Sequence, residues 1–393
     1  MSLSETAAPP PGKSSGRILE LDGIRAVAIL TVIVWHYVHL KTTPEPGSLW
    51  AKANMLFRLT WSGVDLFFVL SGFLIGGILL SQRESTDYFK VFYLRRMCRI
   101  FPLYFGFLAI CAVMQTEAAR EALPGIGWMF TPRLPFWSYL TFTQNFAMAA
   151  MDRFANQALN ITWSLAIEEQ FYLLLPVMIR FIPLRRLPIV LLLLIAAGAG
   201  LRWLLYSLWP SQAGLWCYVL LPCRWDPLFL GVLGAWVLRQ PSWGNRLATA
   251  GRALWISTLL LGLVMVAAAI TAKGVIMAPA MTLGGYLVLG LFYFSAVMLV
   301  LSGHAPRIAA FLRHRWLVHI GVISYGIYLL HESMDGLVHA VLLNAKPRFQ
   351  TAPEMAVTLL AFAITIIVAS LSWRWFERPF VEWSHRHFRY QKR

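Results

Sequence analysis

Charged residues are scarce in this chain of 393 residues. Asp, Glu, Lys and Arg make up 13% of the sequence, about half the share found in soluble domains, whereas 58% of the residues are hydrophobic. The apolar residues occur in runs of about 17 to 25, which is long enough for a helix to cross a hydrocarbon core about 30 Å thick. This composition excludes a soluble enzyme and a disordered chain. It predicts an all-α, polytopic transmembrane helix bundle.

Cysteine is also rare, which excludes a disulfide-based scaffold. The four residues, Cys98, Cys111, Cys217 and Cys223, do not have the spacing of metal ligands, and we expect no metal site. Cys217 and Cys223 lie close enough to the predicted outer face to form a disulfide, but nothing in their spacing requires one.

About ten membrane spans are predicted from the apolar runs. They cover residues 18–40, 61–81, 97–115, 162–182, 187–206, 216–238, 253–272, 278–301, 316–338 and 354–376. Most connections between them are short, as expected for antiparallel helices. The longest connection on the predicted outer side, 116–161, is rich in aromatic residues and is expected to lie at the membrane interface or to cap a cavity.

Acidic residues are few compared with basic ones, 18 against 34, and the net charge is +16. A basic excess of this size is one indication of a nucleic-acid-binding protein. Here, however, 23 of the 34 Lys and Arg residues fall at the predicted cytoplasmic ends of spans and nine fall on the outer side, which leaves Arg202 and Arg224 unassigned to either side. This positive-inside pattern predicts that both termini are cytoplasmic and that nucleic acid is not a partner.

Three regions are predicted along the chain. Residues 1–17 are polar and form a disordered cytoplasmic tail, residues 18–380 form the transmembrane domain, and residues 381–393 form a basic cytoplasmic tail. The first apolar run contains Arg25 and His36 and lacks a clear cleavage site, so we expect it to be a permanent helix and not a signal peptide.

Ionisable residues inside a bilayer are costly and therefore indicate function. Arg25 and His36 are eleven residues apart on the first predicted helix, which places them on one face about 16 Å apart along the axis. An alternative is that Arg25 reaches the cytoplasmic interface and that His36 only bonds a neighbouring helix.

Other ionisable residues fall at a depth similar to that of His36, just inside the predicted outer face. These residues are Asp65, Glu168, Glu169, Arg224, Asp226, His331 and Glu332. Since unrelated residues would not share one depth by chance, this layer predicts a polar cavity that binds substrate. Trp163 and Trp61, at outer helix ends, belong to the interfacial aromatic belt and could also stack on a sugar.

A histidine with a carboxylate partner can take a proton from an alcohol or accept an acyl group itself. Glu168 and Glu169 are adjacent on one helix, so their side chains point about 100° apart and one of them is expected to face His36. We favour Glu169. The other glutamate is expected to form a salt bridge, for which Arg224 is a candidate partner.

A basic cluster, Arg95, Arg96 and Arg99, begins the third predicted helix at its cytoplasmic end. Arg96 and Arg99 are three residues apart and therefore neighbours on one face, where they could hold phosphate groups. The alternative is that the cluster only anchors the helix in the positive-inside sense. Ser71, in the segment SGFLIGG, is expected to serve close helix packing and not to act as a nucleophile.

Taken together, five motifs resemble the acyltransferase family 3 membrane proteins, which include bacterial O-acetyltransferases of glycans and macrolide acyltransferases. The motifs are LDGIRAVAILTVIVWHY, GVDLFFVLSGFLI, the pair Arg96 and Arg99, WSLAIEEQFYLLLPV, and ISYGIYLLH followed by FERPF. They occur in order over essentially the whole chain after the tail.

The resemblance implies a multi-pass enzyme of a bacterial inner membrane that transfers an acyl group, most often acetyl from acetyl-CoA, to a hydroxyl of a glycan or glycoside. It implies catalytic roles for His36 and Arg25, an acidic helix start at Glu168 and Glu169, and donor binding by Arg96 and Arg99. Many relatives have an additional extracytoplasmic esterase domain. This chain ends soon after Phe380, so we expect the bundle, or a separate protein, to complete the reaction.

Transfer could be direct or could pass through an acyl-His intermediate, and the sequence does not choose between them. The alternative function is that of a proton-coupled transporter or flippase of envelope glycan precursors, because carriers also bury Asp, Glu and His. The absence of inverted repeats argues against this alternative.

Overall fold

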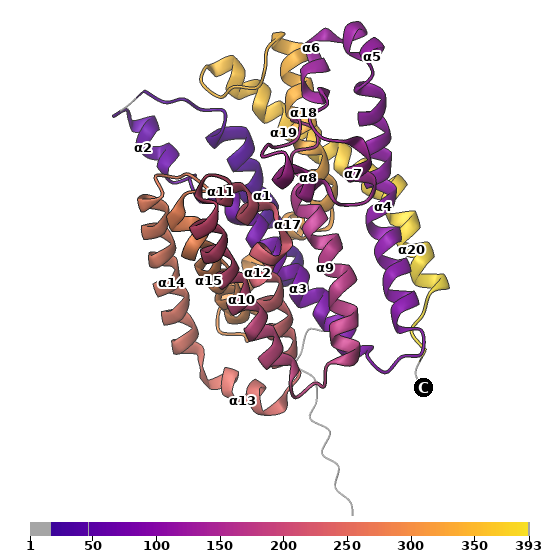
Figure 1. Cartoon of the computed structure of the whole chain (residues 1–393), viewed down its shortest axis with the longest axis vertical. Coiled ribbons are helices and arrows are strands. Elements are labelled where there is room, and N and C mark those ends of the chain that lie inside the picture. Colours follow the sequence, from indigo (N-terminus) through magenta and orange to yellow (C-terminus); the bar gives the residue numbers. More distant parts are fainter. Residues whose placement is uncertain (1–16, 46, 392–393) are drawn as a thin grey trace, which may run out of the picture.

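The computed structural model describes residues 17–45 and 47–391, so nearly all of the predicted tail 1–17 lies outside the described residues. All regular structure within the described ranges is helical, as predicted (Figure 1). The long helices are α1 (Leu19–Ile33), which continues into the π-helix η1 (Val34–His39), α3 (Gly63–Ser81), α4 (Tyr88–Met114), α9 (Thr162–Phe181), α10 (Leu187–Leu208), α12 (Leu221–Val237), α14 (Gly251–Thr271), α15 (Tyr286–Leu301), α18 (Ser324–Leu343) and α19 (Ala352–Ser372).

Shorter helices connect and cap the long ones. They are α2 (Leu49–Met55), η2 (Thr60–Ser62), α5 (Glu117–Ala122), α6 (Pro124–Gly127), η3 (Trp128–Phe130), α7 (Phe136–Leu140), α8 (Gln144–Ala150), α11 (Pro210–Val219), α13 (Pro241–Thr249), η4 (Met281–Gly285), α16 (Pro306–Leu312), α17 (Arg315–Val322), η5 (Trp373–Glu377) and α20 (Arg378–His387). Helix α20 packs against α4, so part of the predicted basic tail 381–393 is folded onto the bundle.

Seven helical segments are long and apolar enough to cross a membrane, which makes the chain a multi-pass membrane protein. They are Leu19–His39, Leu49–Ser81, Tyr88–Met114, Leu187–Leu208, Gly251–Thr271, Met281–Leu301 and Ala352–His387. The total of ten spans and the cytoplasmic position of both termini stay predictions.

Three predicted spans are helical but are not among these seven, namely 162–182, 216–238 and 316–338. The second is divided at Leu220 between α11 and α12, and the third is divided at Ile323 between α17 and α18. Helices α9, α12 and α18 contain six of the ionisable residues singled out above, namely Glu168, Glu169, Arg224, Asp226, His331 and Glu332. His36 and Arg25, in contrast, lie in Leu19–His39, which is one of the seven segments.

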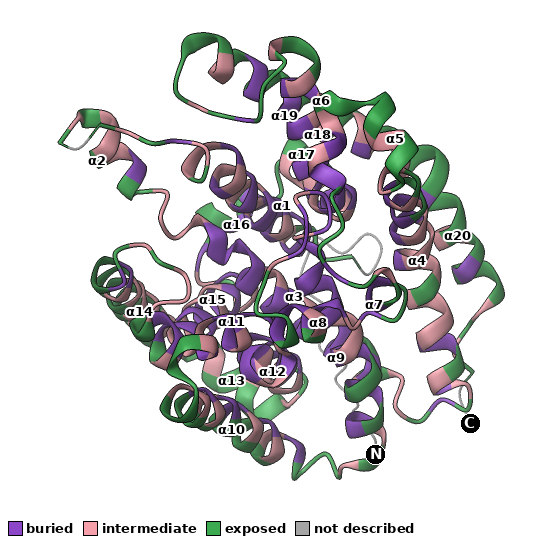
Figure 2. Cartoon of the chain, turned by 45° about the horizontal axis from the view of Figure 1, so that its top comes forward, coloured by how far each residue is buried: buried purple, intermediate pink, exposed green. Residues whose placement is uncertain are grey.

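Helices α3 and α12 pack with their backbones in contact. A methyl group added to Gly72 would lie 1.9 Å from the carbonyl oxygen of Leu228, and one added to Gly231 would lie 2.1 Å from that of Val69. Only glycine fits at either position, as expected for helices that associate through small residues in a membrane. Helix α3 is thereby fixed in the centre of the bundle, where Figure 2 shows the highest density of buried residues.

Two buried ion pairs hold α12 to its neighbours. Arg224 lies 2.8 Å from the carboxylate of Asp65 on α3, and Arg202 on α10 lies 2.6 Å from that of Asp226, and all four side chains are inaccessible to solvent. The Arg224 guanidinium also lies 4.1 Å from the centre of the Tyr286 ring. Arg224 thus pairs with Asp65 and not with a glutamate of α9, and these residues support the bundle.

Replacing Asp65 by asparagine is expected to destabilise the protein by about 3–5 kcal/mol, because Arg224 would remain as a buried charge without its counter-ion. Thermal unfolding in detergent would measure the effect. Asp152→Asn is the matched control, since Asp152 is exposed on a loop. Equal unfolding temperatures for the two variants would contradict a structural role for the pair.

The periphery of the bundle is apolar and exposed. Helix α14, at one side in Figure 1, has large exposed side chains such as Leu259 and Leu263, which is typical of a helix that faces lipid. The segment 116–161 forms α5 to α8 and η3, and α5 and α6 lie at the end of the bundle opposite to α13 (Figure 1).

Candidate functional site

His36 lies in η1, the wider π-helical turn that ends the first membrane helix. Its Nδ1 is 3.0 Å from the carbonyl oxygen of Val32. A carbonyl can only accept a hydrogen bond, so Nδ1 carries the proton in the neutral ring. Nε2 is therefore left with a free lone pair, which can accept a proton or an acyl group.

A second histidine supports this arrangement. The Nδ1 of His331 on α18 donates to the carbonyl of Tyr328 at 2.7 Å, so its Nε2 is an acceptor. That Nε2 lies 3.3 Å from the Nδ1 of His36, with the two rings edge to face at 4.9 Å between centroids. His331 thus helps to hold His36 in the tautomer whose Nε2 is free.

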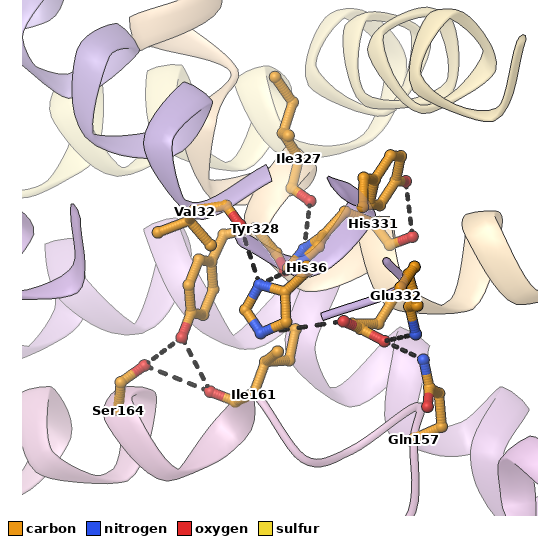
Figure 3. A network of polar contacts seen from close by, with 11 residues as sticks. Val32, His36, Gln157, Ile161, Ser164, Ile327, Tyr328, His331 and Glu332 are labelled. Atoms are coloured by element: carbon orange, nitrogen blue, oxygen red, sulfur yellow. Dashed lines mark hydrogen bonds and ion pairs between the residues drawn. The ribbon is translucent and has the colours of Figure 1, made fainter. Parts of the chain in front are cut away.

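Glu332 is the carboxylate that lies beside Nε2 of His36 among the described residues (Figure 3). Its Oε1 lies 3.8 Å from the Nε2 of His36, and its Oε2 lies 3.9 Å from the Nζ of Lys41 and accepts a hydrogen bond from Gln157. At a separation of 3.8 Å, one hydroxyl oxygen can lie within hydrogen-bond distance of both Nε2 and Oε1. The carboxylate can also stabilise an imidazolium after proton transfer.

The structure does not place Glu168 or Glu169 beside His36, in contrast to the sequence-based prediction. Among the described residues, the carboxylate within 4 Å of His36 belongs to Glu332. Similar depth does not determine which helices are neighbours, and it is α18 that brings its residues to the end of α1. The adjacent His331 and Glu332 in the segment ISYGIYLLHE were the available signal, whereas nothing in the sequence singles out Lys41 or Gln157.

His36 and Glu332 open onto a cavity of about 260 Å³, here called the outer chamber. Its walls include Trp61, Trp163 and Tyr218. The predicted substrate residue Trp163 therefore lines the chamber, while His331 lies behind His36 and is fully buried. Asp65, Arg224 and Asp226 are not among the residues that line it.

A smaller cavity of about 100 Å³, the inner chamber, contains Arg25 and Glu168. Glu168 accepts a hydrogen bond from the Tyr172 hydroxyl at 3.2 Å, and Tyr172 is bonded to Ser71 at 2.7 Å. Arg25 and His36 thus face two different chambers, although they share a face of the first helix.

Tyr328 and Val64 line both chambers and form the wall between them. The Tyr328 hydroxyl lies 2.6 Å from that of Ser164 and donates to the carbonyl of Ile161 at 3.0 Å (Figure 3). Tyr328 therefore stands between the chamber that contains Arg25 and the one that contains His36.

The three arginines at the start of α4 have different environments. Arg95 donates to the carbonyl of Phe388 at 2.6 and 2.9 Å, and Arg99 lies 3.5 Å from the carboxylate of Glu377. In the described part of the chain, Arg96 has no ion pair or hydrogen bond, and its charge interacts with those of Arg25 and Glu168. Arg96 is therefore the member of the cluster available to a ligand.

His36, His331 and Glu332 also offer three atoms within 4.8 Å of one another, as a metal site would. Zinc is bound by nitrogen lone pairs at about 2.0–2.1 Å. The His36 nitrogen that faces His331 carries a proton for Val32, and the other is directed towards Glu332. The arrangement fits a hydrogen-bonded chain better than a metal centre.

A family model described as an acyltransferase domain matches residues 18–374, which include every residue that lines the two chambers. The chain belongs to acyltransferase family 3. The resemblance drawn from the five motifs is thereby confirmed. In this acyltransferase domain, the histidine–carboxylate pair is formed by the first helix and α18.

The chain is similar over 91% of its length to two curated acyltransferase relatives. It is 29% identical to the peptidoglycan O-acetyltransferase OatA of Listeria monocytogenes and 25% identical to the O-acetyltransferase OatA of Staphylococcus aureus. The aligned part is 55% and 56% of these relatives, so the chain spans about half of their length. No solved structure matches the chain.

Proposed function

We propose that this protein is an integral membrane O-acetyltransferase of a bacterial cytoplasmic membrane that moves an acetyl group from acetyl-CoA to a hydroxyl of a glycan or glycoside. The single observation that carries the proposal is the free Nε2 of His36, which faces the carboxylate of Glu332 inside an aromatic chamber. The family membership and the names of the two relatives support the reaction class.

The donor enters from the cytoplasmic side in this proposal. CoA is strongly anionic, and Arg96 forms no ion pair within 4 Å in the described residues, so it is the residue proposed to bind the nucleotide phosphates. The pantetheine arm is about as long as the 16 Å between Arg25 and His36. It would pass through the inner chamber and, after Tyr328 moves, present the thioester to His36.

The reaction begins at Nε2 of His36. This nitrogen removes the proton of the acceptor hydroxyl while the oxygen attacks the thioester carbonyl, the carbon–sulfur bond breaks, and the CoA thiolate takes the proton back from the imidazolium. In the alternative route Nε2 attacks the thioester first, the carbon–sulfur bond breaks and CoA leaves as the thiolate. The acceptor oxygen then attacks the acetyl group on the ring, the carbon–nitrogen bond breaks, and the hydroxyl proton passes through the freed Nε2 to the thiolate. Glu332 stabilises the positive charge on the ring in both routes.

Purified protein in lipid nanodiscs should transfer radiolabel from acetyl-CoA to a glycan extracted from the cell envelope. Arg96→Gln should raise the KM for acetyl-CoA about tenfold and change kcat less than about twofold, since one charge-assisted contact to the donor is lost. Lys90→Gln is the matched control, because Lys90 is an exposed cation on the same helix.

Two outcomes would contradict this account. If no label moves to the extracted glycan although the protein is folded, the proposed activity is wrong and transport is the better interpretation. If Arg96→Gln and Lys90→Gln give the same KM, Arg96 does not bind the donor.

A further inference from the structure

A second cavity borders the outer chamber at the predicted outer end of the bundle. This cavity, the side pocket, has a volume of about 490 Å³, which is within the range of about 300–1,000 Å³ usual for ligand sites. Phe154, Gln157 and Asn160 line both cavities, and Gln157 is the residue that donates to Glu332 (Figure 3). A molecule in the side pocket would therefore lie next to the outer chamber that contains the His36 site.

Two amide side chains in the side pocket have unused hydrogen-bonding groups. Asn156 is 4% exposed, its Oδ1 accepts from the backbone N–H of Leu159 at 3.0 Å, and its Nδ2 has no partner. The Oδ1 of Asn160 is also buried without a partner. Buried polar groups are almost always paired in folded proteins, so an unpaired donor and an unpaired acceptor that line one cavity indicate a polar ligand.

An aromatic surface and a net positive charge complete the side pocket. The indole N–H of Trp128 donates to the carbonyl of Gly125, which leaves the ring face as the part of Trp128 that can contact a ligand. The lining contains two cations, Arg133 and Lys346, and no carboxylate, and the Nζ of Lys346 lies 5.1 Å from the centre of the Trp128 ring. In the described residues, neither cation has an acidic partner within 4 Å.

We infer that the side pocket binds the part of the acceptor next to the acetylated sugar, and that this part is an anionic sugar residue. The amides bond its hydroxyls, the Trp128 ring packs on its apolar face, and Arg133 and Lys346 bind its carboxylate or phosphate. This inference rests on the proposed function and specifies its substrate class, an anionic oligosaccharide of at least two sugar units.

Three tetrasaccharide probes of similar shape would test the inference. They are a neutral tetramer of N-acetylglucosamine, an alternating tetramer of N-acetylglucosamine and N-acetylmuramic acid, which adds carboxylates, and a 6-phosphorylated tetramer of N-acetylglucosamine. Each is titrated against protein in nanodiscs to obtain a Kd by calorimetry, and is then offered with labelled acetyl-CoA to obtain KM and kcat.

The wild type should bind at least one anionic probe about tenfold more tightly than the neutral one, and Arg133→Gln/Lys346→Gln should remove this preference without changing the KM for acetyl-CoA. The anionic probe that binds more tightly shows whether the side pocket prefers a carboxylate or a phosphate group. Arg153→Gln is the control, because Arg153 is an exposed arginine of the same segment that does not line the pocket.

Equal affinities for the neutral and anionic probes, or an equal effect of the double variant and the control, would overturn the inference. A result in which labelled acetyl-CoA is consumed but none of the probes binds would overturn it as well and would leave the proposed function intact. A result in which the anionic probe binds with the expected preference, but no label moves to any acceptor, would instead contradict the proposed function.

Discussion

Replacing His36 by alanine is expected to reduce acetyl transfer by at least about 10³-fold while the protein stays folded. The variant lacks the nitrogen that removes the hydroxyl proton or accepts the acetyl group, whichever route operates. The side chain lines the outer chamber, so its loss enlarges an existing cavity and does not create a new one in the core. Radiolabel transfer and the unfolding temperature, measured on one preparation, would separate chemistry from stability.

His39→Ala is the matched control for this result. His39 belongs to the same π-helical turn, stacks on Trp35 and bonds Asn54 through Nδ1 at 3.0 Å, but it does not line either chamber. This variant should keep most of the wild-type rate. Normal acetylation by His36→Ala, or an equal loss in both variants, would exclude the histidine mechanism.

Replacing Glu332 by glutamine is expected to lower kcat by about 10²–10⁴-fold with little change in the KM for acetyl-CoA. Glutamine keeps the size of the side chain but removes the negative charge that stabilises the His36 imidazolium 3.8 Å away. Arg96, the residue proposed to bind the donor, does not line the outer chamber, so donor affinity should be unaffected. Steady-state kinetics at saturating acceptor would measure the change.

Glu169→Gln and Glu168→Gln decide between the structure and the sequence-based hypothesis. From the structure, neither should reduce kcat as strongly as Glu332→Gln, because neither carboxylate lies within 4 Å of His36. If Glu169→Gln is the most damaging of the three and Glu332→Gln is harmless, the helix that supports His36 is α9, as the sequence suggested. The same three variants therefore test the assignment of the carboxylate independently of the assignment of His36.

The sequence by itself determined the class of the protein. The apolar runs required an all-helical membrane protein, because a chain with so few charges cannot remain in water and a helix satisfies all backbone hydrogen bonds within itself. The motifs identified the family. Because burying an ionisable residue in a bilayer is costly, His36, Arg25, Glu168 and Glu332 could be recognised as candidate site residues, and all four line the chambers. These properties depend on short segments of the chain, so they can be recognised from the sequence alone.

Only the tertiary structure decided which of the buried charges meet. Asp65, Glu168, Asp226 and Glu332 are similar in the sequence, since all are acids predicted to lie at one depth within apolar spans. In the folded chain two of them neutralise arginines, one lines the inner chamber and one faces His36. The difference arises from which helices are neighbours and how each is rotated about its axis, and contacts between distant segments, such as the backbone contact of α3 with α12, fix both.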